Sequence, residues 1–375
     1  MTGLLVWAHS MCRSTAFFYH ELSVQLGVPL KICVAFYDME NFANRSDLGF
    51  SDCEFEGINY ELVGNDIQLA AKILYSHKKY HQIFGVYHIN RTFRKIFIQA
   101  HDLGCKVAVF SEAPINMELG VTRRLLKSLY NGRVLPFRVR PHTRCATFFV
   151  NYSGDDSMEL HRVGWDAGKI IPFGYFPPPI LGSCVKQRNL KHHEDFHILC
   201  TGAVEHIRGV QVLIEACRLL RAYGLAFRVT ITQEGSLRRA LQNQATNDEL
   251  PIDFRGYVPV EQLIALYEEC SCFVACGLSE PWGIRVNDAL NCGAPLIVSD
   301  GMGVKKLVNE VYAGRIFKAG DPIALASMLF DLMTDPSMYL KVAADSANAF
   351  NKISPKAASA RLVRHINYVA PFWLE

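Results

Sequence analysis

Short, continuous apolar runs alternate with helical patterns along almost the whole chain of 375 residues. Strands of a parallel sheet are covered by helices on both faces, so they read as unbroken apolar runs bounded by turns. The sequence therefore predicts an α/β fold with parallel sheets. The expected strands are residues 4–8, 32–36, 83–87, 107–110, 148–151, 197–201, 227–232, 272–276 and 296–299.

The length predicts two domains, because it exceeds the size at which a single hydrophobic core stops growing. A segment rich in proline and charge, 176–195, is typical of a linker. We expect one doubly wound, Rossmann-like domain over 1–175 and another over 196–354. Ligands of such sheets bind beyond the carboxyl ends of the strands, so the expected site is the cleft between the two domains.

Several classes of protein are disfavoured by composition and motifs. The net charge of +3 by itself says little about partners. No apolar stretch reaches the roughly 18 residues that span a bilayer, which disfavours an integral membrane protein. The N-terminus has no signal-peptide pattern, and the twelve cysteines have no disulfide-scaffold spacing, which favours a reducing cytoplasm. Cys270, Cys272 and Cys276 lie in an expected strand, so no metal site is predicted there. Neither domain carries G-x-G-x-x-G after its first strand, which disfavours a dinucleotide dehydrogenase.

Loops that follow the strands of the second half carry the candidate binding residues. Gly202 follows a strand and Arg208 opens a helix, where an arginine beside free amides suits a diphosphate. A solvated arginine at a helix start is the alternative. The turn of Gly256, Tyr257 and Val258 also precedes a helix, and its backbone groups could read the edge of a base.

Two carboxylates flank the start of one expected helix in the stretch SEPWGIRVNDALNCGAPLIVSD, residues 279–300. Glu280 stands before a Pro-Trp-Gly turn, Asp288 lies eight positions later, and the helix ends at Gly293. This stretch resembles the pattern E-P-F-G-x-x-x-x-E-A-M-A-x-G-x-P-V-V of glycosyltransferase family 4, the retaining GT-B nucleotide-sugar transferases. TGAVEHIRG, FRGYVPVEQLIALY, DGMGVKKLV and YAGRIFKAGDPIALASML continue the resemblance in order, from about residue 197 to 335. The first half is similar more weakly, through GVYHINRTFRK, VAVFSEAP and KIIPFGYF.

The resemblance implies a GT-B fold, with two Rossmann-like domains facing across a cleft and a final helix, 355–375, crossing back onto the first domain. It implies that Glu280 bonds hydroxyls of the donor sugar and that Asp288 holds the ribose. Trp282, Gly283 and Ile284 would then offer backbone amides to the sugar and phosphates. Asp288 lies one turn past Ile284 on the same helix face.

Several positions depart from the family pattern. Asp288 replaces a glutamate, which sets its carboxylate back by one methylene, about 1.5 Å. Ala203 stands where the family usually has a diphosphate-binding arginine, and Arg208 takes the place of a lysine. Arg285 either supplies the missing charge or lies on the surface. Lys306, at the position of a family glutamate, would add a further cation near the phosphates.

The first domain offers two candidates for the acceptor side. Glu112, in VFSEAP, stands where many family members have a histidine near the reacting sugar. His88, in YHIN, is either a second group near the acceptor or a satisfied core histidine.

A basic segment of the first domain suits an anionic membrane surface. Residues 119–154 contain no acidic side chain, and apolar residues are interspersed among their cations. The alternative is a solvated basic face. No nucleic-acid-binding module accompanies the segment, so nucleic acid is not an expected partner. The cations are Arg123, Arg124, Lys127, Arg133, Arg138, Arg140 and Arg144.

The resemblance thus implies a retaining, metal-independent glycosyltransferase that needs no cofactor. Its donor would be a UDP-sugar, carrying a hexose or an N-acetylhexosamine such as GalNAc. Its acceptor would be a polyprenyl-diphosphate-linked glycan in bacterial O-antigen, lipopolysaccharide or other surface-polysaccharide synthesis. We expect the enzyme in the cytoplasm, peripherally associated with the inner face of the cell membrane. The alternatives are a catalytically silent sugar-nucleotide-binding or scaffold relative, and a sugar-nucleotide epimerase of the same fold.

Overall fold

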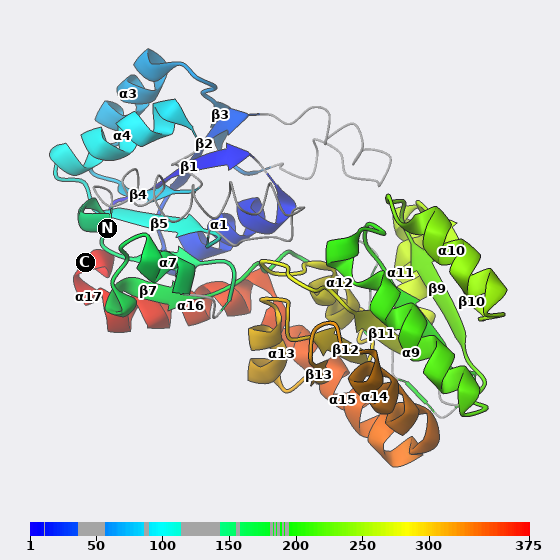
Figure 1. Cartoon of the computed structure of the whole chain (residues 1–375). Helices are drawn as coiled ribbons and strands as arrows, with labels where there is room; N and C mark the ends of the chain where they lie inside the picture. The colour runs from blue at the N-terminus through cyan, green and yellow to red at the C-terminus, as the bar shows by residue number, and fades with distance from the viewer. Residues whose placement is uncertain are drawn as a thin grey trace. The chain divides into compact units, whose positions relative to one another are not determined.

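The chain divides into two compact units in the computed structural model (Figure 1). The first unit is Met1–Pro178 together with Pro355–Glu375, and the second is Pro179–Ser354. The structure describes residues 1–10, 12–36, 57–85, 90–113, 143–154, 158–180, 183, 185, 188–189, 191 and 195–375.

The first unit is built on a seven-stranded parallel sheet of order β3-β2-β1-β4-β5-β6-β7. Its strands are β1 (Leu4–Ser10), β2 (Leu30–Phe36), β3 (Tyr60–Leu62), β4 (His81–Phe84), β5 (Val107–Ser111), β6 (Phe149–Asn151) and β7 (Ile170–Pro172). Its helices are α1 (Arg13–Leu26), α3 (Ile67–Ser76), α4 (Arg91–Asp102), α7 (Met158–Arg162), α16 (Pro355–Val369) and α17 (Pro371–Leu374), with a 3₁₀ turn at Ala167–Lys169.

The end of the chain completes this first unit. Helix α16 packs on α1 and β7. Trp373 of α17 is fully buried, and its ring meets His81 and Phe148 edge-on at centroid distances of 4.8 and 5.1 Å. Residues about 300 positions apart in sequence therefore share one core.

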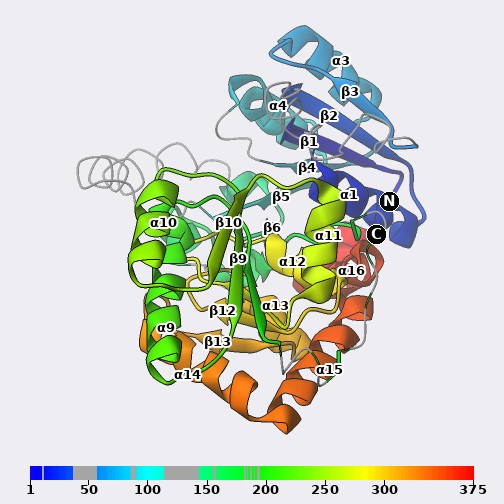
Figure 2. The same cartoon turned by 90° about the vertical axis from the view of Figure 1, so that its right-hand side faces the viewer.

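The second unit is built on a six-stranded parallel sheet of order β10-β9-β8-β11-β12-β13, with helices on both of its faces (Figure 2). Its strands are β8 (His197–Cys200), β9 (Arg228–Thr232), β10 (Ile252–Gly256), β11 (Cys272–Ala275), β12 (Leu296–Ser299) and β13 (Arg315–Phe317). Its helices are α9 (Val210–Ala222), α10 (Arg238–Asn247), α11 (Val260–Glu269), α12 (Arg285–Asn291), α13 (Lys305–Val311), α14 (Pro322–Thr334) and α15 (Pro336–Ile353), with a 3₁₀ turn at His206–Arg208.

The strand order of the second unit points to one place for a ligand. Counted within the unit the order is 3-2-1-4-5-6, so the chain reverses direction across the sheet between β8 and β11. Helices that follow two such strands leave on opposite faces, which opens a crevice beyond their carboxyl ends. The loops after Cys200 and Ala275 therefore border the expected ligand position.

The predicted α/β class with two doubly wound parallel sheets is confirmed, and each expected strand overlaps an observed one. Expected strand 83–87 is observed as β4, and residues 86–89 lie outside the described part of the chain. The prediction missed β3, β7, β10 and β13, which are the four outer strands of the two sheets. Three of them have only three residues, and β3 and β10 keep exposed positions. An edge strand is less fully covered, so it lacks the unbroken apolar run.

A buried histidine begins the first strand of the second unit. His197 is 1% exposed, and its Nε2 lies 2.9 Å from Thr230 Oγ1 on β9. Burial, together with the positive charges of Arg228 and Arg255, lowers the pKa of His197 from its ordinary 6.5 to about 4. The folded unit therefore holds this imidazole neutral at pH values where the unfolded chain protonates it.

Acidification should consequently destabilise the second unit through His197. Its folded pKa lies below the unfolded value, so stability is complete above pH 6.5 and is lost as the pH falls from 6.5 towards 4. Between pH 7 and pH 5 we expect the free energy of unfolding to fall by about 2 kcal/mol through this residue. Urea unfolding of the wild type and of His197→Gln at both pH values measures the effect. An equal loss of unfolding free energy in the wild type and in His197→Gln would contradict the assignment of this pH dependence to His197.

Candidate functional site

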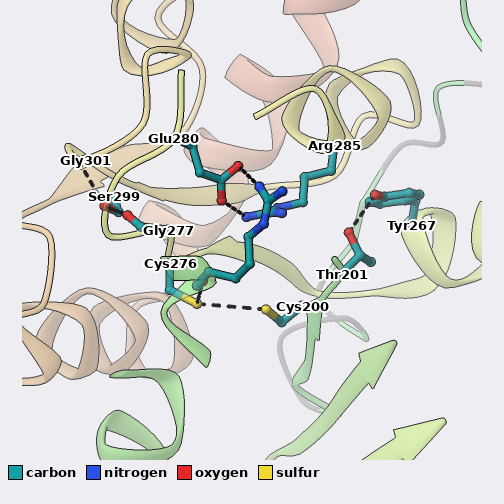
Figure 3. A network of polar contacts seen from close by, with 10 residues as sticks. Cys200, Thr201, Tyr267, Cys276, Gly277, Glu280, Arg285, Ser299 and Gly301 are labelled. Atoms are coloured by element: carbon teal, nitrogen blue, oxygen red, sulfur yellow. Dashed lines mark hydrogen bonds and ion pairs between the residues drawn. The ribbon is translucent and has the colours of Figure 1, made fainter. Parts of the chain in front are cut away.

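Glu280, between β11 and α12, forms ion pairs with the side chains of Arg208 and Arg285. Figure 3 shows its contact with Arg285. Oε2 of Glu280 is 2.5 Å from Nη1 of Arg208, and its Oε1 accepts a hydrogen bond from Nη2 of Arg285. The side chains of Glu280 and Arg285 are 3% and 12% exposed, whereas that of Arg208 is 38% exposed. A carboxylate this deeply buried requires such partners, because an unpaired buried charge is strongly destabilising.

Gly202 leaves the space that the guanidinium group of Arg285 occupies. A Cβ on Gly202 would lie 2.4 Å from Nη1 of Arg285, and the residue has a φ of +111°. Only glycine meets both conditions without strain. Burial by itself would lower the pKa of Arg285, but the neighbouring Glu280 carboxylate raises it above its usual value. Arg285 therefore stays charged inside the site, beside Ala203, and the alternative of a surface position is wrong.

The loop that carries Glu280 is tied to the loop after β12. The amide of Glu280 donates to Gly301 O at 3.0 Å, and that of Gly303 donates to Glu280 O at 3.1 Å. Ser299 Oγ donates to Gly277 O at 2.5 Å and accepts from the Gly301 amide at 3.0 Å (Figure 3). These bonds hold the backbone around the carboxylate. Sequence reasoning missed Ser299, although a hydroxyl at the end of an apolar strand was a usable signal.

Asp288 lies on α12 near a buried tyrosine. Tyr267 is 1% exposed and shares a hydrogen bond with Thr201 Oγ1 at 3.0 Å. Burial raises the pKa of Tyr267 well above its ordinary value, and the negative charge of Asp288 raises it further. Tyr267 on α11 is thus a neighbour of Thr201, which follows β8, and of Asp288 on α12. No sequence signal marked Tyr267, because its position on α11 is typical of an ordinary core residue.

The Pro-Trp-Gly turn leads into α12 through a buried side chain. Trp282 is 3% exposed, and its Nε1 donates to Asn287 Oδ1 at 2.9 Å. Gly283 has a φ of +106°, and a Cβ there would meet Met302 Cε at 2.2 Å. Ile284 is exposed. The indole therefore anchors the turn, and the roles proposed for the three backbone amides stay predictions.

The turn after β10 combines a buried and an exposed side chain. Gly256 has a φ of +69°, and its carbonyl accepts from the Gln233 amide at 2.5 Å. Val258 is buried, whereas Tyr257 is 68% exposed. The carbonyl of Gly256 thus already has a partner, which leaves the contact to a base as a prediction for the rest of the turn.

Other candidates have structural partners or lie outside the described residues. Lys306 pairs with Glu310 at 2.9 Å on α13. In the first unit, Glu112 follows β5 and accepts a hydrogen bond from Tyr175 at 3.0 Å. Burial raises the pKa of Glu112, and the Tyr175 bond counteracts part of the rise. His88 is among the residues that the structure does not describe, and so are Arg123, Arg124 and Lys127.

Two searches of the described residues bear on cofactors and membranes. They contain no group of three or more His, Cys, Asp and Glu side chains that could hold a metal ion. None of the helices in the described part of the chain is long and apolar enough to cross a membrane.

Comparison with known proteins names the family of this domain. Residues 185–349 match the family model described as glycosyl transferases group 1. The second unit is a group 1 glycosyl transferase domain. The resemblance drawn from the motifs is confirmed at this level, because the match contains Gly202, Arg208, Glu280, Arg285 and Asp288.

Curated relatives match over parts of their length. The amylovoran biosynthesis glycosyltransferase AmsK of Erwinia amylovora is 27% identical over 148 residues, which are 37% of this chain and 36% of AmsK. WcaL of Salmonella typhimurium, which carries the name of a colanic acid biosynthesis glycosyltransferase, is 26% identical over 229 residues, or 56% of each chain. The chain thus spans about a third to just over half of the length of these relatives.

A solved structure matches the whole chain. HepE of Anabaena, solved in complex with UDP, aligns with a TM-score of 0.70 and 13% identity, covering 98% of this chain and 100% of HepE. At this identity the likeness concerns the fold. Together with the two parallel sheets, it supports the predicted two-domain GT-B class.

Proposed function

We propose that this chain is a retaining glycosyltransferase that moves a hexose or N-acetylhexosamine from a UDP-sugar to a polyprenyl-diphosphate-linked glycan. The product would belong to an O-antigen or another bacterial surface polysaccharide. The observation that carries the proposal is the Glu280 carboxylate, buried between two guanidinium groups at the crevice of a group 1 domain.

Charge balance suits this cluster to a diphosphate. In the described part of the chain, one carboxylate faces Arg208 and Arg285 together, so the group carries a net charge of about +1 in a largely buried place. A nucleotide diphosphate would neutralise it, and guanidinium groups bind phosphate through charged, directional hydrogen bonds. Arg285 would provide the charge that the family takes from an arginine at the position of Ala203.

The same charges would act on the reaction itself. As the bond between sugar and diphosphate breaks, negative charge grows on the leaving phosphate, and cations already in place stabilise it. We propose that Arg208 and Arg285 do this without a bound metal. Glu280 would bond the hydroxyls of the donor sugar, and Asp288 would hold the ribose.

Retention follows if the acceptor hydroxyl attacks from the side of the leaving group. Its proton would pass to the departing phosphate, so no enzymic nucleophile is required. Glu112 and His88 are our candidates for groups near the acceptor. The names of AmsK and WcaL, which refer to the biosynthesis of amylovoran and colanic acid, support a polysaccharide product. The UDP bound to HepE supports the choice of nucleotide.

Substitution of Glu280 tests the proposed sugar contact. Glu280→Gln should slow transfer by roughly a hundredfold or more, because a charged hydrogen bond to the sugar contributes about 1.5–3 kcal/mol and the catalytic geometry depends on it. Affinity for UDP should stay within a few fold, since UDP lacks the donor sugar that Glu280 would contact. The measurements are transfer rates with a panel of UDP-sugars and UDP titration calorimetry, with Glu215→Gln as a surface control. Parallel loss of UDP affinity and activity would show that the sugar role is wrong.

The same assays on the wild type distinguish the alternative functions. UDP binding without transfer by the wild type would favour the silent alternative, and donor conversion without acceptor would favour an epimerase.

Substitution of the arginines tests the diphosphate contact. Arg208→Ala and Arg285→Ala should each weaken UDP binding by about tenfold or more, because each removes charged hydrogen bonds worth roughly 1.5–3 kcal/mol. Uridine has no phosphate, so its affinity should not change. Arg315→Ala is a matched control, since Arg315 pairs with Asp331 at 2.8 Å. It is the first residue of the outer strand β13, so it lies at the opposite end of the parallel strands from the loops that follow β8 and β11. Equal effects on UDP and uridine would refute the phosphate role.

We further propose that the basic segment from Arg123 to Arg144 binds the anionic inner face of the cell membrane. The protein should then sediment with anionic liposomes and not with neutral ones, and added salt should weaken the binding, because ions screen surface charge. Charge reversal at Arg123, Arg124 and Lys127 should depress transfer to a long-chain lipid acceptor more than to a short soluble analogue. Binding that ignores lipid charge and salt would contradict this proposal.

A further inference from the structure

Two buried cysteines lie next to the arginine cluster (Figure 3). The sulfur atoms of Cys200 and Cys276 are 3.9 Å apart, and the two residues are 3% and 0% exposed. Cys200 ends β8, and Cys276 follows β11. They therefore lie at the carboxyl ends of two neighbouring strands.

Sheet register accounts for the shared face of the two thiols. β8 and β11 are neighbours, with Ile198 opposite Cys272 and Leu199 opposite Phe273. Side chains alternate between the faces of a sheet, so Ile198 and Cys200 share a face with Cys272 and Cys276. All four belong to one buried core cluster. A disulfide has a sulfur–sulfur length of about 2.05 Å, so the two atoms would have to approach by about 1.9 Å.

The surroundings of the two thiols shift their pKa values in opposite directions. A hydrogen bond from Cys276 lowers the pKa of Cys200, and the positive charge of Arg285 lowers it further, against the effect of burial. The same bond and burial raise the pKa of Cys276. Cys200 is thus the thiol that more readily gives the nucleophilic thiolate, while Cys276 keeps its proton.

Each cysteine is also connected to one of the arginines. Cys276 Sγ lies 3.5 Å from the carbonyl oxygen of Arg208, and the carbonyl of Cys276 packs so closely on Gly209 that a Cβ there would lie 1.8 Å away. Cys200 stands two residues before Gly202, which lies against Arg285. We therefore expect movement of the two sulfur atoms towards each other to shift the backbone next to the guanidinium groups.

We propose that Cys200 and Cys276 are a redox-sensitive pair that a peroxide closes into a disulfide, which disturbs the two arginines around Glu280. The Cys200 thiolate would attack the O–O bond of hydrogen peroxide, giving a sulfenic acid and hydroxide. The Cys276 thiol would then attack that sulfur, forming the S–S bond and releasing water. In total, two thiols lose two electrons and two protons, and one peroxide becomes two waters. A thiol reductant would reverse the reaction.

Formation of the bond can be tested independently of the proposed function. The full-length protein is treated with hydrogen peroxide, and peptides are mapped by mass spectrometry under non-reducing conditions. We expect a cross-linked pair of peptides that contains Cys200 and Cys276 and disappears with dithiothreitol. Cys200→Ala and Cys276→Ala should each abolish it, whereas Cys217→Ala, a buried cysteine of the same cluster, should leave it. No such peptide, or a bridge from Cys200 to Cys217, would overturn the proposal.

The effect of the bond on the site rests on the proposed function. Because a displacement of about 1 Å in a catalytic site can cost roughly a hundredfold in rate, we expect oxidation to weaken UDP binding at least ~tenfold. Dithiothreitol should restore it, and Cys200→Ala and Cys276→Ala should be insensitive to peroxide. Unchanged UDP affinity of the bridged protein would overturn the coupling. A reduced wild type that does not bind UDP would instead refute the proposed function and, with it, this coupling.

Discussion

The ion pairs of Glu280 are the interaction on which the architecture of the site depends. A carboxylate that is 3% exposed needs charged partners, because an unpaired buried charge is strongly destabilising, and here two guanidinium groups provide them. Arg208 comes from the loop after β8, Glu280 from the loop after β11, and Arg285 from α12. Arg208 is distant in sequence from the stretch that carries Glu280 and Arg285, and the two segments meet because the order of the sheet brings β8 and β11 together. The ion pairs therefore fasten the segment after β8 to the segment after β11, at the carboxyl ends of the two strands.

Small residues make this charge cluster possible. The side chain of Arg285 packs against Gly202, where a Cβ atom would clash with its guanidinium group. The loop that carries Glu280 is hydrogen-bonded to the segment from Ser299 to Gly303. Close approach of backbone and side chains needs glycine, and hydrogen bonds then fix the geometry that sterics permit. The buried arginine and the glycine under it are thus one structural feature.

Sequence reasoning predicted the elements whose burial produces a local hydrophobic pattern. The inner strands are covered on both faces and were predicted as apolar runs, while the four outer strands, such as the exposed β3, were missed. Glu280 and Asp288 were found through a motif. The burial of Arg285 could not be decided from its neighbours in sequence, since it depends on Gly202, some eighty residues earlier. Tyr267 acts through tertiary contacts alone, so its sequence position provided no specific signal of a site. The hydroxyl of Ser299, at the end of an apolar strand, was a signal that the prediction did not use.

The return of α16 and α17 to the first unit makes the second unit an insertion within it. The chain passes between the units twice, near Pro178 and near Ser354. During synthesis the second unit is therefore complete while the first still lacks Trp373, the side chain that fills the space between His81 and Phe148. Domains form as units while the chain emerges. The unit whose synthesis begins first is consequently the last to close its core, and until then its unfilled side stays open to water and to other chains.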